Sequence, residues 1–133
     1  MVEVNNLTTN KIDESFLIGL AKKVLQGENK KELELSIVLV GQGRIRELNR
    51  KYRRKNKATD VLSFQYNDSG EVVICLSVLK KNAKKFKSTF KKELSRVLIH
   101  GILHILGYSH ITMKNKETYY LDGDESLIHL NLR

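Results

Sequence analysis

The sequence predicts an α+β fold, a single domain with a small mixed sheet of about four strands and about five helices. Three short apolar runs of strand length, at 34–40, 60–65 and 71–75, predict the sheet. Apolar residues recur at helical spacing in the segments around these runs and predict the helices. The 133-residue chain contains no proline, repeat or linker, so we expect residues 1–133 to share one hydrophobic core.

The first predicted helix runs from Asp13 to Gly27, and the strand at 34–40 (ELSIVLV) follows it. This strand is β-branched and mostly apolar, which suits the centre of the sheet. The helix has apolar residues at helical spacing, namely Phe16, Leu17, Leu20, Val24 and Leu25.

A second helix follows a turn at Gly41 and Gly43. Its residues Ile45, Leu48 and Tyr52 lie at positions i, i+3 and i+7 and predict one buried face. The other faces display cations, namely Arg44, Arg46, Arg50, Lys51 and Arg54.

The strands at 60–65 and 71–75 are joined by a predicted turn. Ser77 is the expected N-cap of a third helix. The core stripe of that helix is expected to contain Leu79, Ala83, Phe86 and Phe90.

A strongly apolar fourth helix, from about residue 91 to 106, belongs in the core. The tail after it is polar up to Asp124, and Ser126–Leu132 is expected to form a short final helix.

The basic residues fall into two blocks. The net charge is +9; residues 42–57 hold eight Lys or Arg and one Glu, and residues 80–92 hold seven Lys and no acid. Such blocks are typical of a surface that binds a polyanion such as nucleic acid. The alternative is a solvated lysine-rich surface that only aids solubility.

A reducing, cytoplasmic location is expected. Cys75 is the only cysteine and lies in a strand-like run, so we expect a buried, inert thiol. The N-terminal residues show no secretory signal, and no apolar run approaches the ~18 residues that a membrane span needs.

Three histidines in the segment at 100–110 (HGILHILGYSH) predict a metal site. His100 and His104 are four residues apart and share one face of the fourth helix. Gly107 can adopt a positive φ, end the helix and reverse the chain, which lets His110 return as a third ligand. Three neutral imidazoles leave one coordination position open for water, as in catalytic zinc sites.

Zinc is the expected ion, although ligation by nitrogen alone also suits nickel, copper or iron. The alternative interpretation is two hydrogen-bonded core histidines and one surface histidine. In an otherwise apolar helix, buried histidines without partners would cost free energy, which favours the metal site. His129 lies apart from this segment and is expected on the surface.

The histidine spacing is that of the metzincin zinc proteases. Those enzymes carry Glu directly after the first histidine as general base, and Gly101 stands at that place here. A zinc peptidase is therefore the weaker enzyme hypothesis.

The histidine segment and the first basic block together resemble the YbeY family of bacterial metal-dependent endoribonucleases. The family signature HGxLHLxGYDH is similar to HGILHILGYSH at 100–110. A second family block, LNxxYRxKDKPTDVLSFP, is similar to residues 48–64, and the GDIxI strand is similar to residues 70–74.

This resemblance implies a zinc-dependent, single-strand-specific endoribonuclease that acts in ribosomal RNA maturation, notably at the 3′ end of the small-subunit RNA, and in ribosome quality control. It implies one metal-dependent hydrolase domain with His100, His104 and His110 as metal ligands. It also implies that Arg53 matters for activity, and we expect Arg53 to grip the scissile phosphate.

The expected partners are single-stranded RNA, ribosomal RNA and the ribosome. The residues expected to track the RNA backbone are Arg44, Arg46, Arg50, Arg54, Lys55, Lys84, Lys85 and Lys87. No aromatic stacking surface is evident in the sequence, so we expect sequence specificity to come from a partner or from the ribosome.

The chain departs from the family pattern at four positions. Ser109 and Glu71 each stand where the family has Asp, and Ala58 and Gln65 replace two prolines. Two other functions stay open: a zinc hydrolase of a small molecule or peptide, and a non-catalytic ribosome-associated RNA-binding module with a structural metal.

Overall fold

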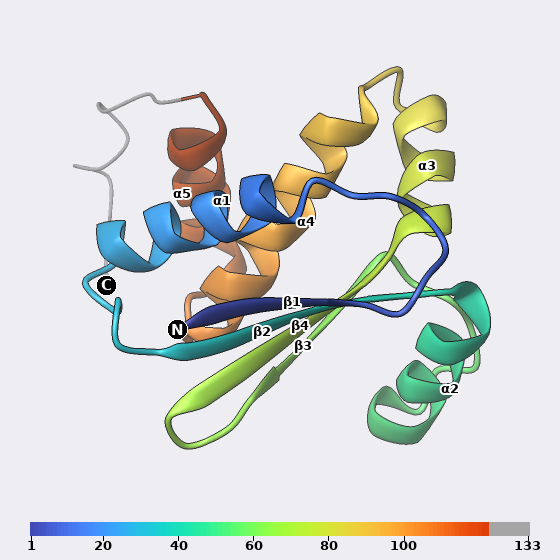
Figure 1. Ribbon diagram of the computed structural model, residues 1–133, viewed down its shortest axis with the longest axis horizontal. Coiled ribbons are helices and arrows are strands. Elements are labelled where there is room, and N and C mark those ends of the chain that lie inside the picture. The colour runs from blue at the N-terminus through green and yellow to red at the C-terminus, as the bar shows by residue number, and fades with distance from the viewer. Residues whose placement is uncertain (123–133) are drawn as a thin grey trace.

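The computed structural model describes residues 1–122, apart from the side chain of His110, and confirms the α+β prediction. Four strands form one mixed sheet (Figure 1). The strands, in spatial order, are β1 (Val2–Asn6), β2 (Glu34–Val40), β4 (Ser69–Cys75) and β3 (Val61–Gln65). The first three are parallel, whereas β3 pairs antiparallel with β4 and lies at the end of this order.

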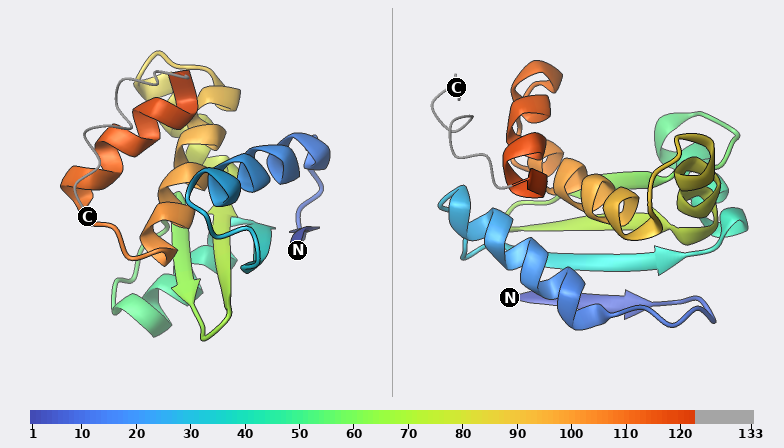
Figure 2. Two further views of the ribbon diagram at one scale, coloured as in Figure 1. Left: turned by 90° about the vertical axis from the view of Figure 1, so that its left-hand side faces the viewer. Right: turned by 90° about the horizontal axis from the view of Figure 1, so that it is seen from above.

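The helices lie on both sides of the sheet (Figure 1). One side carries α1 (Glu14–Gly27), α3 (Leu76–Lys85), α4 (Phe90–Ile105) and α5 (His110–Asp122). The other side carries α2 (Gln42–Arg53) alone. Figure 2 shows α1 and α4 side by side above the strands, with α5 against the far side of α4.

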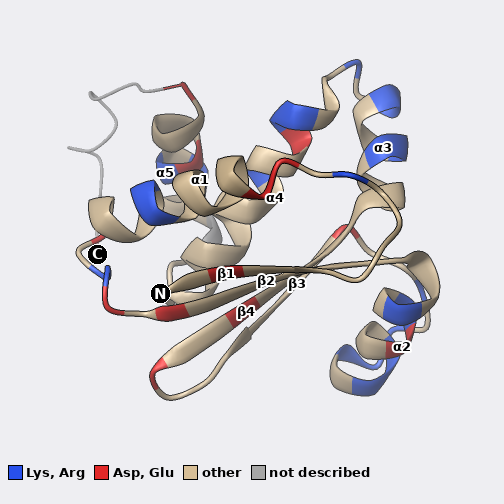
Figure 3. Cartoon of the chain, viewed as in Figure 1, with Lys and Arg blue, Asp and Glu red and all other residues tan. Residues whose placement is uncertain are grey.

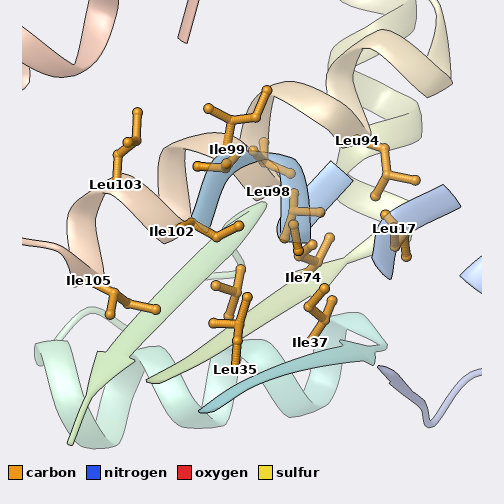
Figure 4. Close-up of a cluster of buried hydrophobic side chains, with 14 of the residues drawn as sticks. Leu17, Leu35, Ile37, Ile74, Leu94, Leu98, Ile99, Ile102, Leu103 and Ile105 are labelled. Atoms are coloured by element: carbon orange, nitrogen blue, oxygen red, sulfur yellow. The ribbon is translucent and has the colours of Figure 1, made fainter. Parts of the chain in front are cut away.

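The larger hydrophobic core lies between the sheet and the α1–α4 layer. Figure 4 shows Ile102 and Ile105 of α4 next to Leu35, Ile37 and Ile74 of the strands. The smaller core lies under α2, where the fully buried Ile45 packs with residues such as Val73 and Cys75. The predicted buried thiol is therefore confirmed.

Gly101 lets α4 approach the sheet closely. A Cβ atom added at this position would lie 2.8 Å from a methyl carbon of Val72 and 3.6 Å from one of Val61. No side chain larger than hydrogen fits without moving the helix away from the strands. The sequence of α4 thus places its histidine-bearing end directly against β3 and β4.

Two elements are not predicted by the sequence analysis. β1 is short and only half-buried, with Val2 and Val4 against the core. The polar segment of α5 is helical because Met113, Lys116 and Tyr120 are buried along one side. The final helix predicted at 126–132, together with His129, lies outside the described residues.

Two predictions for α3 are wrong. The helix begins directly after β4, with Cys75 at the N-cap position in place of Ser77 and no capping hydrogen bond from its side chain. The helix ends at Lys85, and Lys87 has a φ of 52°. This bend removes Phe86 and Phe90 from the predicted core stripe of α3: Phe86 is 63% exposed, and Phe90 is the first residue of α4.

Within the part of the chain that the structure describes, no helix is long and apolar enough to cross a membrane.

Gly101→Ala should lower the free energy of unfolding by about 1–3 kcal/mol, because the added methyl group overpacks the contact with Val72. Gly19→Ala is the matched control: Gly19 is also inside a helix, and its Cβ would meet nothing within 4 Å. That control should gain about 0.5–1 kcal/mol from helix propensity. Urea denaturation measures both changes, and equal stabilisation of the two variants would contradict the close contact.

Candidate functional site

The end of α4 is shaped by a glycine turn that follows the histidines. Gly107 has a φ of +88°, its N–H donates to the carbonyl of His104 at 3.0 Å, and the N–H of Tyr108 donates to the carbonyl of Leu103 at 3.3 Å. These two bonds form a Schellman motif. The predicted helix end and chain reversal at Gly107 are confirmed, and α5 begins at His110 directly after the turn.

His104 lies in a pocket of about 610 Å³ at the edge strand β3. Its ring is exposed, and its Nδ1 atom lies 3.2 Å from the hydroxyl of Ser63 on β3. Arg53 of α2 and Glu71 of β4 line the same pocket. Glu71, which stands where the family has Asp, therefore borders the site.

His100 forms a hydrogen bond with a residue that the sequence does not predict. Its Nδ1 atom lies 2.7 Å from a carboxylate oxygen of Glu117 on α5. The hydrogen bond with Glu117 raises the pKa of the His100 imidazole above its ordinary value, although partial burial acts against this shift. Because α5 looks like a polar tail in the sequence, the sequence carries no signal for this pair.

The two histidines suit a metal site with imidazole ligands. Both contacts use Nδ1, so they are compatible with ligation of a metal ion through the two Nε2 atoms. A carboxylate behind a ligating histidine is the usual arrangement at zinc sites, because it fixes the tautomer and orients the ring. Among the side chains that the structure describes, no three potential metal ligands form a cluster; the predicted third ligand, His110, falls outside that set.

Arg53 is fixed at the edge of the sheet by three contacts. Its Nη2 atom donates to the carbonyl of Ser63 at 2.8 Å, and its Nη1 atom donates to the carbonyl of Tyr52 at 3.2 Å. Its guanidinium carbon lies 5.1 Å from the ring centroid of Phe64. Ser63 thus connects both predicted site residues, since its hydroxyl contacts His104 and its carbonyl contacts Arg53.

The structure separates the predicted RNA-binding residues into two groups. Arg44 lines the pocket, and Arg46, Arg50, Arg54 and Lys55 are exposed along α2 or just after it. Lys84, Lys85 and Lys87 are exposed at the end of α3, next to the start of α4 (Figure 3). The start of α4, which is next to them, lies about 20 Å along the helix from His104, because an α-helix rises about 1.5 Å per residue.

Ser109 keeps a capping role where the family has Asp. Its carbonyl accepts from the N–H of Met113 at 2.9 Å, and its hydroxyl accepts from the N–H of Thr112 at 3.4 Å. These are the bonds of an N-cap residue, here at the start of α5, and Ser and Asp are equally good at this position. The departure therefore preserves the local structure of the turn before His110.

Position 101 has no room for the general base of a zinc peptidase. A glutamate there would replace the glycine that contacts Val72, and its side chain would enter the core between α4 and β4. The packing of α4 thus agrees with the sequence argument against a peptidase mechanism.

A buried polar network attaches α5 to α1. The Nζ atom of Lys116 lies 2.9 and 3.1 Å from the two carboxylate oxygens of Glu28, and these side chains are only 6% and 3% exposed. The hydroxyls of Tyr108 and Tyr120 also donate to Glu28. Burial alone would raise the pKa of Glu28, but these hydrogen bonds and Lys116 hold it below its ordinary value. The network fixes the helix that carries Glu117.

Comparison with known proteins gives one consistent family. The family model described as Endoribonuclease YbeY matches residues 3–131. An endoribonuclease YbeY from Chlorobium luteolum is 39% identical over 111 residues, which cover 80% of this chain and 81% of that protein. The endoribonuclease YbeY from Thermosipho melanesiensis is 41% identical over 107 residues, 78% of each chain.

A solved structure supports the same relationship. The solution structure of a Thermotoga maritima protein aligns with a TM-score of 0.65 and 31% identity, and the alignment covers 98% of this chain and 93% of that one. The family match includes α2, β3, β4 and α4, the elements that line the pocket.

Lys116→Met should lower the free energy of unfolding by about 3–5 kcal/mol, because it leaves the buried Glu28 carboxylate without its cation. Thermal and urea unfolding followed by circular dichroism measure this loss. Lys114→Met, on the exposed side of the same helix, is the matched control and should change stability by less than about 0.5 kcal/mol. Similar small effects for both variants would show that the pair does not hold α5.

Proposed function

This chain belongs to the YbeY family of endoribonucleases, and we propose that it is a zinc-dependent, single-strand-specific member that acts in ribosomal RNA maturation. It is a hydrolase of RNA phosphodiester bonds, as its family is. The proposed target is the 3′ end of the small-subunit RNA, with a further role in ribosome quality control. Cytoplasmic location and association with the ribosome are parts of this proposal, as is the assignment of residues 1–133 to one hydrolase domain.

One observation supports this function most directly: a histidine and an arginine from distant segments line the same pocket. His104 comes from α4 and Arg53 from α2, and Ser63 on β3 contacts both. A metal-ligating histidine beside a guanidinium suits a phosphodiester, since the guanidinium can bind two phosphate oxygens in its plane.

The proposed metal ligands are His100, His104 and His110. When bound, zinc would supply Lewis-acid polarisation of the attacking water or of a phosphate oxygen. Glu117 would hold the His100 ring through Nδ1, and Ser63 would do the same for His104.

Arg53 is the proposed catalytic residue. Its contacts with the carbonyls of Ser63 and Tyr52 hold the side chain in place before substrate binds. A guanidinium has five N–H donors, more than these two carbonyls take up, so it can also donate to the scissile phosphate. Because its position is fixed in advance, it can stabilise the charge that develops on that phosphate without reorganisation.

The arginines of α2 are proposed to bind the RNA backbone on both sides of the pocket. They are exposed on the helix that carries Arg53 and lie in one of the two basic blocks of the chain (Figure 3). The lysines at the end of α3 lie beside the start of α4, about 20 Å along that helix from His104, so they would bind a more distant part of the same RNA or of the ribosome.

Arg53→Ala should lower the rate of single-stranded RNA cleavage by at least about 100-fold, because it removes the donor that stabilises the phosphate. Metal content, measured by elemental analysis, should stay at the wild-type value. Arg54→Ala is the matched control, since it removes the neighbouring exposed cation that does not line the pocket. This control should lose only a few-fold in affinity, as expected for one phosphate contact. Equal losses in both variants would show that Arg53 acts only as one more surface cation and has no catalytic role.

Glu117→Gln should weaken metal binding by about 10–100-fold, as loss of a carboxylate behind a ligating histidine does. Competition with a fluorescent zinc chelator measures the affinities, and Glu3→Gln on the exposed side of β1 serves as control.

His104→Ala should lose bound metal and RNA cleavage together, and wild-type protein treated with chelator should lose cleavage as well. A fully metallated His104→Ala, or chelator-resistant cleavage, would refute the proposed metal site.

A further inference from the structure

Aromatic side chains line the pocket beside Arg53, although no such surface is evident from the sequence. Tyr52 is near the end of α2, Phe64 lies on β3, and Tyr66 follows that strand. Tyr52 and Tyr66 are 51% and 55% exposed. The rings of Tyr52 and Phe64 meet edge to face with 5.4 Å between their centroids. Exposed aromatic side chains gathered in one pocket are typical of a binding site.

Glu71 adds a carboxylate to these rings. It pairs in register with Phe64 across the β3–β4 ladder, so both side chains point to the α2 face of the sheet. Glu71 and Tyr66 line the same pocket, where partial burial, then the Glu71 carboxylate and Tyr52, raise the pKa of the Tyr66 phenol above its ordinary value. Phe64, Tyr66 and Glu71 thus face one pocket of about 610 Å³, a volume that suits a small ligand.

Cations surround the same pocket. The Nζ atom of Lys51 lies 5.3 Å from the centroid of Tyr52, and Arg53 lies over Phe64. Arg44 lines the pocket on the same side, although it is paired with Glu47 at 3.2 Å. A simple anion would be repelled by Glu71, and an apolar ligand would not need the arginines. A nucleotide has both parts: a flat ring with polar edges and a phosphate.

We propose that this pocket holds one unpaired nucleobase of the RNA, stacked on the exposed tyrosines, and that Glu71 selects bases with an exocyclic amino group. This rests on the proposed function, because the phosphate of the same nucleotide would lie at Arg53. Cytosine and adenine present an amino donor that a carboxylate accepts, whereas uracil presents a carbonyl there. A base already paired in a duplex cannot enter, which gives single-strand specificity a physical cause.

The selectivity is tested with octamers of cytidine and of uridine, which have the same backbone and ring size. Metal-loaded protein is titrated with the 2′-O-methyl forms at one fixed salt concentration, and gel electrophoresis checks that they stay intact. Wild type should bind the cytidine octamer about tenfold more tightly, as one direct contact to a base edge provides. Glu71→Gln should bring the ratio close to one, because an amide can donate as well as accept. Equal wild-type affinities would overturn the role of Glu71.

The stacking is tested by Tyr66→Ala, which should weaken binding of the cytidine octamer about tenfold, and by Tyr66→Phe, which keeps the ring and should bind like wild type. Leu7→Ala is the control, since Leu7 is 61% exposed and lines neither the pocket nor the proposed RNA-binding surfaces. Full binding by Tyr66→Ala, or an equal loss in Leu7→Ala, would overturn the base site.

Parallel cleavage assays on unmodified RNA separate this inference from the proposed function. If the protein cleaves single-stranded RNA but shows no preference between the octamers, the proposed function stands and the base site is refuted. Protein that shows the predicted preference and its dependence on Glu71 and Tyr66, yet cleaves no RNA, supports the base site and refutes the function.

Discussion

The close contact between α4 and the sheet is the constraint on which the candidate site depends. Because residue 101 has no side chain, α4 lies directly against Val72 and Val61. This contact places His104 within hydrogen-bonding distance of Ser63 on the edge strand. A helix farther from the strands would move His104 away from Ser63, the residue that also contacts Arg53. The glycine that excludes a peptidase base is thus also the residue that assembles the pocket.

The edge strand β3 contributes side chains to both faces of the sheet at the pocket, because consecutive side chains of a strand point to opposite faces. Ser63 faces α4 and contacts His104, whereas Phe64 faces α2 and contacts Tyr52. At the edge itself, the carbonyl of Ser63 has no neighbouring strand in the described sheet and accepts from Arg53. Two adjacent residues therefore connect the proposed metal site, the proposed phosphate-binding residue Arg53 and the proposed base pocket.

The sequence predicts those elements that depend only on the spacing of residues close together in the chain. Apolar spacing identifies α1, α2, α4 and three strands, and the histidine–glycine spacing identifies the helix end at Gly107. Apolar spacing does not predict α5, because this helix buries a charged residue, Lys116, at a position where a buried helix face usually has an apolar one. Glu117 and the aromatic pocket are missed for a similar reason: each depends on side chains that meet only in the tertiary structure. Metal ligation by His100, His104 and His110, the role of Arg53 and the RNA contacts stay predictions.

The pairing of Glu28 with Lys116 joins positions 88 residues apart, and this distance has a consequence for biosynthesis. Since α5 follows every other described element in the chain, its contacts with Glu28 and His100 are the last of the described contacts that can form during synthesis. A chain in which α5 has not yet docked would lack both the Lys116–Glu28 pair and the contact of Glu117 with His100. The arrangement around His100 is therefore complete only when the last described helix is in place.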